Sequence, residues 1–199
     1  MSDATQMSRD LQYVRGLVDP AARPHLPRAV MLVLAAMVLI GFPLPDFVGG
    51  DFVLRYWLVA GSVGFIACAA LSARAMRRSG QEDLRSARRY FAHWALLLVA
   101  GGLALLLPQT GTIDWSALAP MVLLLVAFAY LTAGVHLDVN LAGPGIAFAL
   151  GYCLLAYRVA YAWTITGVVA ALALVLSAEL TRRHSVASDA QRDRRDLAG

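Results

Sequence analysis

Two histidines, His93 and His136, are the residues of this sequence whose type and placement could do chemistry. Each lies near an end of a long charge-free stretch. If these stretches form antiparallel neighbouring helices, we expect both imidazoles at a similar depth, with Asp138 and Glu179 at the same level. Two histidines on facing helices could ligate haem or another metal, or relay protons. The alternative is that both are ordinary interfacial histidines.

The other reactive side chains form no known pattern of a site. Cys68 and Cys153 each lie inside an apolar run, outside any Cys-x-x-Cys or Cys/His cluster, so we interpret them as small buried side chains. HExxH, GxSxG and Walker-type motifs do not occur. We therefore assign no catalytic, cofactor-binding or metal-binding residue and expect a protein that is not an enzyme and holds no cofactor.

A stripe of small residues recurs every four positions between residues 60 and 72. Its members, which would share one face of a helix, are Ala60, Gly64, Cys68 and Ser72. Such a stripe lets a neighbouring helix backbone approach closely. We expect it to pack within the chain, and a homo-oligomer interface is the alternative.

The composition and the charge spacing predict the elements that carry these residues. The chain has 199 residues, of which 59% are hydrophobic and 15% charged, against about 25% charged in a soluble domain. Charged residues bound six windows of 17 to 24 uncharged residues. A helix needs about 20 apolar residues to cross a bilayer. The sequence predicts an all-α, polytopic transmembrane helix bundle over 29–180, with spans at 29–48, 55–73, 90–108, 116–136, 140–157 and 160–179.

Two of these spans are the weakest of the six. The first ends at Pro43 and Pro45, and its charge-free window only just reaches spanning length. The fifth contains Gly143-Pro144-Gly145, which we interpret as the entrance of the helix. A shorter or re-entrant fifth segment is the alternative.

The arginines predict the orientation. All 17 basic residues are arginine, and 15 of them lie in the N-terminal segment, between residues 74 and 89, or after residue 181. Positive charge stays on the cytoplasmic side, so we expect both termini there. The arginine-only, Ala- and Leu-rich composition indicates a bacterial inner membrane protein. Trp57, Trp94, Trp115 and Trp163 near the helix ends fit interfacial belts.

Three polar segments are expected on the cytoplasmic side. Residues 1–28 form an N-terminal segment with a short amphipathic helix over 8–18, and residues 181–199 form a frayed polar tail. The loop from Arg74 to Arg89 is expected to bind anionic lipid head groups and no nucleic acid. On the opposite side, Arg158 is expected to pair with Asp114, Asp51 or Asp46 as a clip between loops.

The leading functional hypothesis is a non-enzymatic integral membrane component that acts by packing against a partner membrane protein or a second copy of itself. The first alternative is a small transporter or channel subunit for an ion or small molecule. Its cavity would be walled by Thr132, Tyr130, Tyr152, Thr164 or Thr166. The second alternative is a haem or metal-binding membrane protein that uses His93 and His136.

Overall fold

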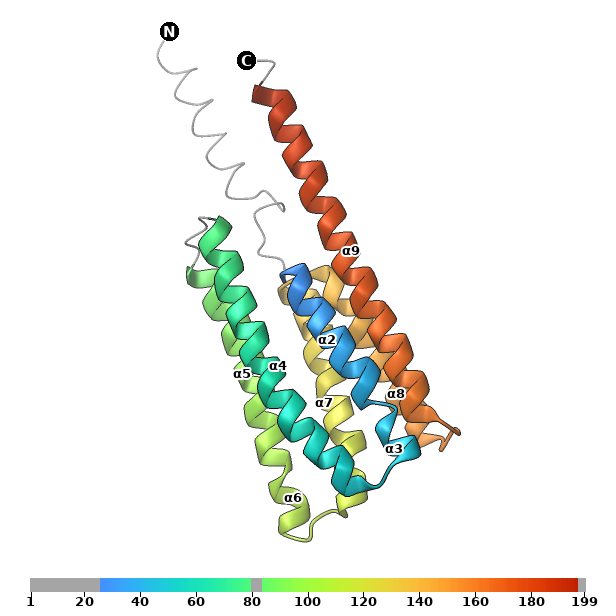
Figure 1. The fold of residues 1–199 in the computed structure, drawn as a ribbon. Coiled ribbons are helices and arrows are strands. Elements are labelled where there is room, and N and C mark those ends of the chain that lie inside the picture. The colour runs from blue at the N-terminus through green and yellow to red at the C-terminus, as the bar shows by residue number, and fades with distance from the viewer. Residues whose placement is uncertain (1–25, 80–83, 197–199) are drawn as a thin grey trace.

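The computed structural model describes residues 26–79 and 84–196, and every regular element in these ranges is helical. Six helical stretches are long and apolar enough to cross a membrane, as predicted (Figure 1). They are Arg28–Phe47, Gly50–Ala75, Arg88–Gln109, Trp115–His136, Val139–Ala156 and Ala162–Arg183. The amphipathic helix expected over 8–18 lies outside the described residues. The chain is therefore an all-helical protein of the multi-pass membrane type.

The first two spans meet in a proline-directed turn. Helix α2 (Arg28–Gly41) ends just before Pro43, and the short helix α3 (Leu44–Phe47) continues the apolar stretch. Proline lacks the backbone N–H that would continue the helical hydrogen bonds, so the break falls where the sequence predicts the end of the span. Helix α4 (Gly50–Ser79) then runs back along α2.

The third and fourth spans repeat this design. Helix α5 (Leu84–Ala104) is followed by a single turn, α6 (Leu106–Gln109), which contains Pro108. A loop with Gly111 in a left-handed conformation leads to α7 (Trp115–His136). Helix α5 packs along α7, so this hairpin brings together helices that are consecutive in the sequence.

The last two spans begin at a 3₁₀ turn, η2 (Val139–Leu141). Helix α8 (Ala142–Ala156) is continuous, and its Gly143-Pro144-Gly145 sequence falls in the first turn, where proline is tolerated. A tight turn then places Arg158 and Tyr161 at positive φ values of 54° and 56°. Helix α9 (Ala162–Asp196) follows and packs on both α8 and α2.

Helix α9 corrects the prediction for the end of the chain. Residues after 181 were expected to fray, but the helix continues to Asp196 and reaches well beyond the bundle (Figure 1). Its 35 residues correspond to about 52 Å at 1.5 Å per residue, far more than a bilayer needs. Residues 182–196 contain five arginines and two alanines, which favour helix, and this propensity outweighs the polarity of the segment.

The helices pack in a spatial order that differs from their order in the sequence. Contacts run from α5 to α7, α8, α9, α2 and finally α4. Helix α9 is therefore central, with α8 on one side and α2 on the other. Of the residues in the α4 and α5 spans, 6% are buried, against 28–44% in the other four spans. The hairpin formed by α4 and α5 is the peripheral part of the bundle.

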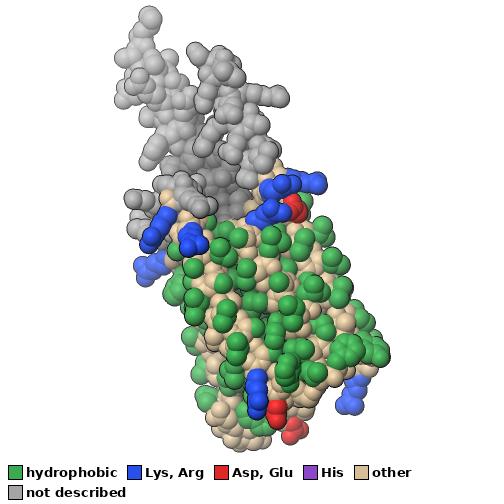
Figure 2. Space-filling view, viewed as in Figure 1, with side chains coloured by type: hydrophobic (Ala, Val, Ile, Leu, Met, Phe, Trp, Pro, Cys, Tyr) green, Lys and Arg blue, Asp and Glu red, His purple; other side chains and the backbone are tan. Residues whose placement is uncertain are grey.

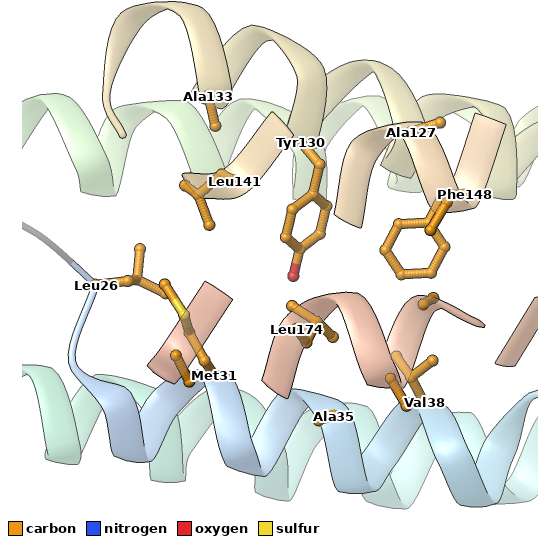
Figure 3. Close-up of a cluster of buried hydrophobic side chains, with 14 of the residues drawn as sticks. Leu26, Met31, Ala35, Val38, Ala127, Tyr130, Ala133, Leu141, Phe148 and Leu174 are labelled. Atoms are coloured by element: carbon orange, nitrogen blue, oxygen red, sulfur yellow. The ribbon is translucent and has the colours of Figure 1, made fainter. Parts of the chain in front are cut away.

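The core lies between α2, α7, α8 and α9. Tyr130 extends from α7 between Leu141 and Phe148 toward Leu174 of α9 (Figure 3). Its ring contacts the ring of Phe148 at a centroid distance of 5.4 Å and that of Trp94, from α5, at 5.1 Å. Aromatic contacts of this kind add to the stabilisation from area burial. Tyr130 thus connects α7 to α5 and α8 and lies against α9.

The outer surface is apolar over the middle of the bundle. Hydrophobic side chains cover this band, and charged side chains gather at its two ends (Figure 2). An exposed apolar surface of this extent would be an aggregation liability in water. It is suited to the hydrocarbon of a bilayer.

Close helix approaches depend on glycine at α7 and α8. A Cβ atom built on Gly134 would lie 2.8 Å from backbone atoms of Ala142, and one on Gly145 would lie 2.7 Å from the backbone nitrogen of Leu131. Backbone atoms cannot move aside as a flexible side chain can. The close contact between α7 and α8 therefore requires residues without a Cβ atom at positions 134 and 145.

We expect Gly134→Ala to lower the free energy of unfolding by about 1–3 kcal/mol, the usual range for overpacking. Gly102→Ala is the control, because a Cβ there meets nothing within 4 Å. Thermal unfolding of the detergent-purified protein would measure both. Equal melting temperatures for the two variants would contradict the close α7–α8 contact.

Candidate functional site

The structure does not bring His93 and His136 together. His93 of α5 lies partly buried, and its Nε2 donates to the carbonyl oxygen of Ala129 at 2.9 Å. Ala129 lies on α7. His136 is exposed at the last turn of the same helix, seven residues or about 10 Å beyond Ala129. The two imidazoles differ in depth, contrary to the expectation. Among the described residues, no group of three His, Cys, Asp or Glu side chains could hold a metal ion.

A junction of polar side chains, formed by Asp138, Asn140, Ser177 and Thr181, connects the start of α8 to α9. Asp138 is 4% exposed, and its Oδ1 accepts the backbone N–H of Asn140 at 3.0 Å. Ser177 donates to the carbonyl oxygen of Asn140 at 2.6 Å. The Asn140 amide reaches Thr181 Oγ1 at 3.4 Å. We call these four residues the polar junction; it holds the η2 turn against α9.

An ion-pair cluster lies beside the polar junction on α9. Glu179 accepts from Arg28 of α2 at 2.5 Å and from Arg182 at 3.0 Å. Glu179 was expected at the level of the histidines as part of a site, but its two carboxylate oxygens bind arginines. Because the side chains are 31–58% exposed, the pairs contribute little energy. The Arg28 pair connects α2 to α9, and the Arg182 pair lies within α9.

At the opposite end of α9, Asp46 of α3 caps the helix. Its Oδ2 accepts the backbone N–H of Thr164 at 2.7 Å and the hydroxyl of Thr164 at 2.6 Å. A carboxylate at a helix N-terminus satisfies otherwise unpaired N–H groups and interacts favourably with the helix dipole. The expected ion pairs of Arg158 with Asp46, Asp51 or Asp114 do not form; among these described residues Asp46 binds a helix terminus instead.

The five side chains expected to wall a transport cavity lie in different environments. Tyr130 is buried in the core, and Thr166 is buried with its hydroxyl donating to the carbonyl oxygen of Ala162. Thr132 is exposed and bonds within its own helix, while Thr164 binds Asp46. Tyr152 packs against the core from α8. These residues do not form one wall.

The small-residue stripe packs within the chain, as expected. A Cβ on Gly64 would overlap the thioether of Met37 on α2, and Cys68 packs against the core cluster. Tyr56 supports the same contact by donating to the carbonyl oxygen of Met37 at 2.9 Å. Gly64 and Cys68 of the stripe therefore contact other helices of this chain.

The residues that connect helices through polar contacts were mostly absent from the sequence-based candidates. The sequence predicted Asp46 only as a partner for Arg158, and it predicted no role for Asn140 or Ser177. An Asx pattern at Asp138-Val139-Asn140, between two apolar stretches, was the available signal for the polar junction. Among the described residues, no buried side-chain nitrogen or oxygen lacks a hydrogen-bond partner. Asp46, Asn140 and Ser177 join helices, whereas Thr132 and Thr166 bond within their own helices.

No family model, curated protein or solved structure matches this chain.

We expect Asp46→Ala to lower the free energy of unfolding by about 1–3 kcal/mol, because it removes two hydrogen bonds at the α9 terminus. The control is Asp51→Ala, at an exposed acidic residue in the first turn of α4. Thermal unfolding in detergent would compare them. A melting temperature for Asp46→Ala no lower than that of the control would show that the cap is not a stabilising contact.

Proposed function

We propose that this protein is a non-catalytic component of a bacterial inner membrane, which acts by associating with another membrane protein or a second copy of itself. The observation that carries this proposal is the use of interior polar groups. Asp46, Asp138 and Ser177 each bind a backbone group of the bundle, and Glu179 binds two arginines. Side chains committed in this way serve packing rather than turnover.

The peripheral hairpin supports association as the mode of action. Helices α4 and α5 pack on the bundle along one side each and expose large apolar side chains elsewhere, including Ile66 and Leu96 at 67% and 69% exposure. Helix association in membranes is driven by packing and by interhelical hydrogen bonds rather than by a hydrophobic driving force. The outward sides of α4 and α5 are the part of the bundle with most room for a partner helix.

The proposed orientation places both termini in the cytoplasm. Arg28, Arg182 and the exposed arginines at the end of α4 and the start of α5 lie at one end of the bundle, together with the start of α2 and the end of α9 (Figures 1 and 2). An excess of arginine marks the cytoplasmic side. The α6–α7 loop then faces the opposite compartment.

A cysteine-labelling experiment tests this orientation. On a background with Cys68 and Cys153 replaced by serine, we expect Thr110→Cys to react with a membrane-impermeant maleimide in intact cells, because Thr110 is exposed in the outer loop. Arg77→Cys should react only after the membrane is permeabilised. The reverse pattern would invert the topology, and labelling of both sites in intact cells would argue against a membrane-embedded bundle.

A site-specific photo-cross-linking experiment tests association. We expect a cross-linker at Ile66 or Leu96 to trap a second membrane polypeptide in cells, and one at Leu172, an exposed residue of α9, to trap far less. Native mass spectrometry in mild detergent would identify the partner or a second copy. A monomer without cross-links at any of the three positions would contradict the proposal.

A further inference from the structure

The turn between α8 and α9 carries an exposed group of aromatic and basic side chains, at the end of the bundle opposite the start of α2 (Figure 1). Tyr157 is 84% exposed, Tyr161 is 60% exposed, and Arg158 is exposed between them. The Tyr161 ring stacks on the exposed ring of Phe47 from α3 at a centroid distance of 5.9 Å. We call these four residues the turn cluster; their side chains lie on the outside of the bundle and not in its core.

The backbone of this turn would suit glycine better than the residues it carries. Helix α8 ends in a Schellman motif, in which the N–H of Arg158 donates to the carbonyl oxygen of Leu155 at 3.0 Å. The N–H of Val159 donates to the carbonyl oxygen of Leu154 at the same distance. Arg158 takes the left-handed position of the motif, with φ at 54°, where glycine is usual because it has no Cβ atom. Tyr161, with φ at 56°, has the same steric cost. Strained backbone of this kind is typical of positions whose side chains serve a function.

Arg158 presents its charge to the surroundings of the bundle. Among the described residues it forms no ion pair, and Asp46 of the adjacent α3 binds Thr164 instead. A guanidinium carries five N–H donors in a planar arrangement that matches the oxygens of a phosphate. The hydroxyl groups of Tyr157 and Tyr161 are further donors. The chemistry of the turn cluster therefore suits an anionic group with several oxygen atoms.

The length of the preceding span places the turn cluster at the edge of the hydrocarbon. The span Val139–Ala156 has 18 residues and is the shortest of the six. At 1.5 Å per residue it covers about 27 Å, against a hydrocarbon layer of ~30 Å. The polar junction lies at the start of this span, so no helix remains to carry the turn cluster into water. Tyr157 and Tyr161 therefore lie in the head-group layer, which favours tyrosine rings, and lipid phosphates lie within reach of Arg158.

We propose that the turn cluster binds the phosphodiester of one anionic phospholipid, with the phosphate on the guanidinium of Arg158 and the rings of Tyr157 and Tyr161 in the same head-group layer. The short span favours a lipid over a protein in the aqueous phase, because it keeps the turn at the membrane surface. The proposal depends on the chain spanning a membrane. It depends neither on the orientation of the termini nor on a partner protein.

Photo-cross-linking to lipid tests the position of the phosphate. The full chain would be reconstituted in phosphatidylcholine vesicles that contain phosphatidylglycerol with a photoactivatable head group, and adducts should form on the peptide that carries residues 157–161. Arg158→Gln should lower the adduct yield about fivefold, the loss of one arginine at an anionic surface. Arg55→Gln removes the same charge at the same end of the bundle, on α4, which does not pack along α8 or α9. It should change the yield less than about twofold. Equal losses for both variants would indicate diffuse attraction and overturn the site.

A glycine variant separates lipid binding from folding. Arg158→Gly removes the side chain and relieves the left-handed backbone. Its melting temperature in detergent should be equal to or above that of the wild type, while its adduct yield should fall as far as that of Arg158→Gln. A wild-type adduct yield would overturn the proposal. A lower melting temperature together with a lost adduct would show that the Arg158 side chain supports the turn, and would also overturn it.

An aromatic variant and two competing occupants complete the test. Tyr157→Ala should lower the adduct yield at least about twofold, whereas Phe52→Ala, at a 57% exposed residue near the same end of α4, should not. Inorganic phosphate in place of chloride at equal ionic strength should leave the yield unchanged; suppression would assign Arg158 to a free phosphate ion. A cross-linker at Tyr157 that trapped a polypeptide in cells instead of phospholipid would assign the turn cluster to a protein. Either result would overturn the lipid site, and neither bears on the cross-links at Ile66 and Leu96 that test the proposed function.

Discussion

The absence of water from the hydrocarbon layer is the constraint on which the rest of this structure depends. An unpaired polar group there costs several kcal/mol, so each one must find its partner inside the protein. Helical backbone satisfies its own groups, which leaves only the turns and the polar side chains. Several of those side chains bind where helices begin or end: Asp46 at the start of α9, and Asp138 and Asn140 between α7 and α8, where Ser177 of α9 also binds.

Helix α9 is consequently the organising element. Asp46 holds one end of its membrane span, and Arg28 and the polar junction hold the other. Between these ends its buried face is small, with Ala170, Ala171 and Ala178, so that α2 and α8 approach closely. The hairpin of α4 and α5 has only a single contact stripe on each helix. The helices α2, α7, α8 and α9 therefore form the tightly packed part of the bundle, and α4 and α5 form the exposed part.

Much of the fold was accessible from the sequence because charges avoid hydrocarbon and thus mark the helix ends. Six membrane-length helices and the intrachain role of the Gly64 stripe followed from that rule and from residue size. The partners of His93, Glu179 and Asp46 could not be predicted, because they depend on spatial order, in which α2 lies beside α9 and not only beside α4. The polar composition of residues 182–196 predicted a frayed tail, but their helix propensity extends α9 to Asp196.

The continuity of α9 has a mechanical consequence. The helix passes without interruption from the turn at Tyr161 through the bundle and projects about 20 Å beyond Arg183. A helix that pivots about the contacts near Glu179 acts as a lever for the segment beyond them. A tilt of about 10° at the level of Glu179 would displace the far end sideways by roughly 4 Å, through simple rotation of a segment about 25 Å long. A small tilt of α9 within the bundle would thereby become a larger displacement of its projecting end.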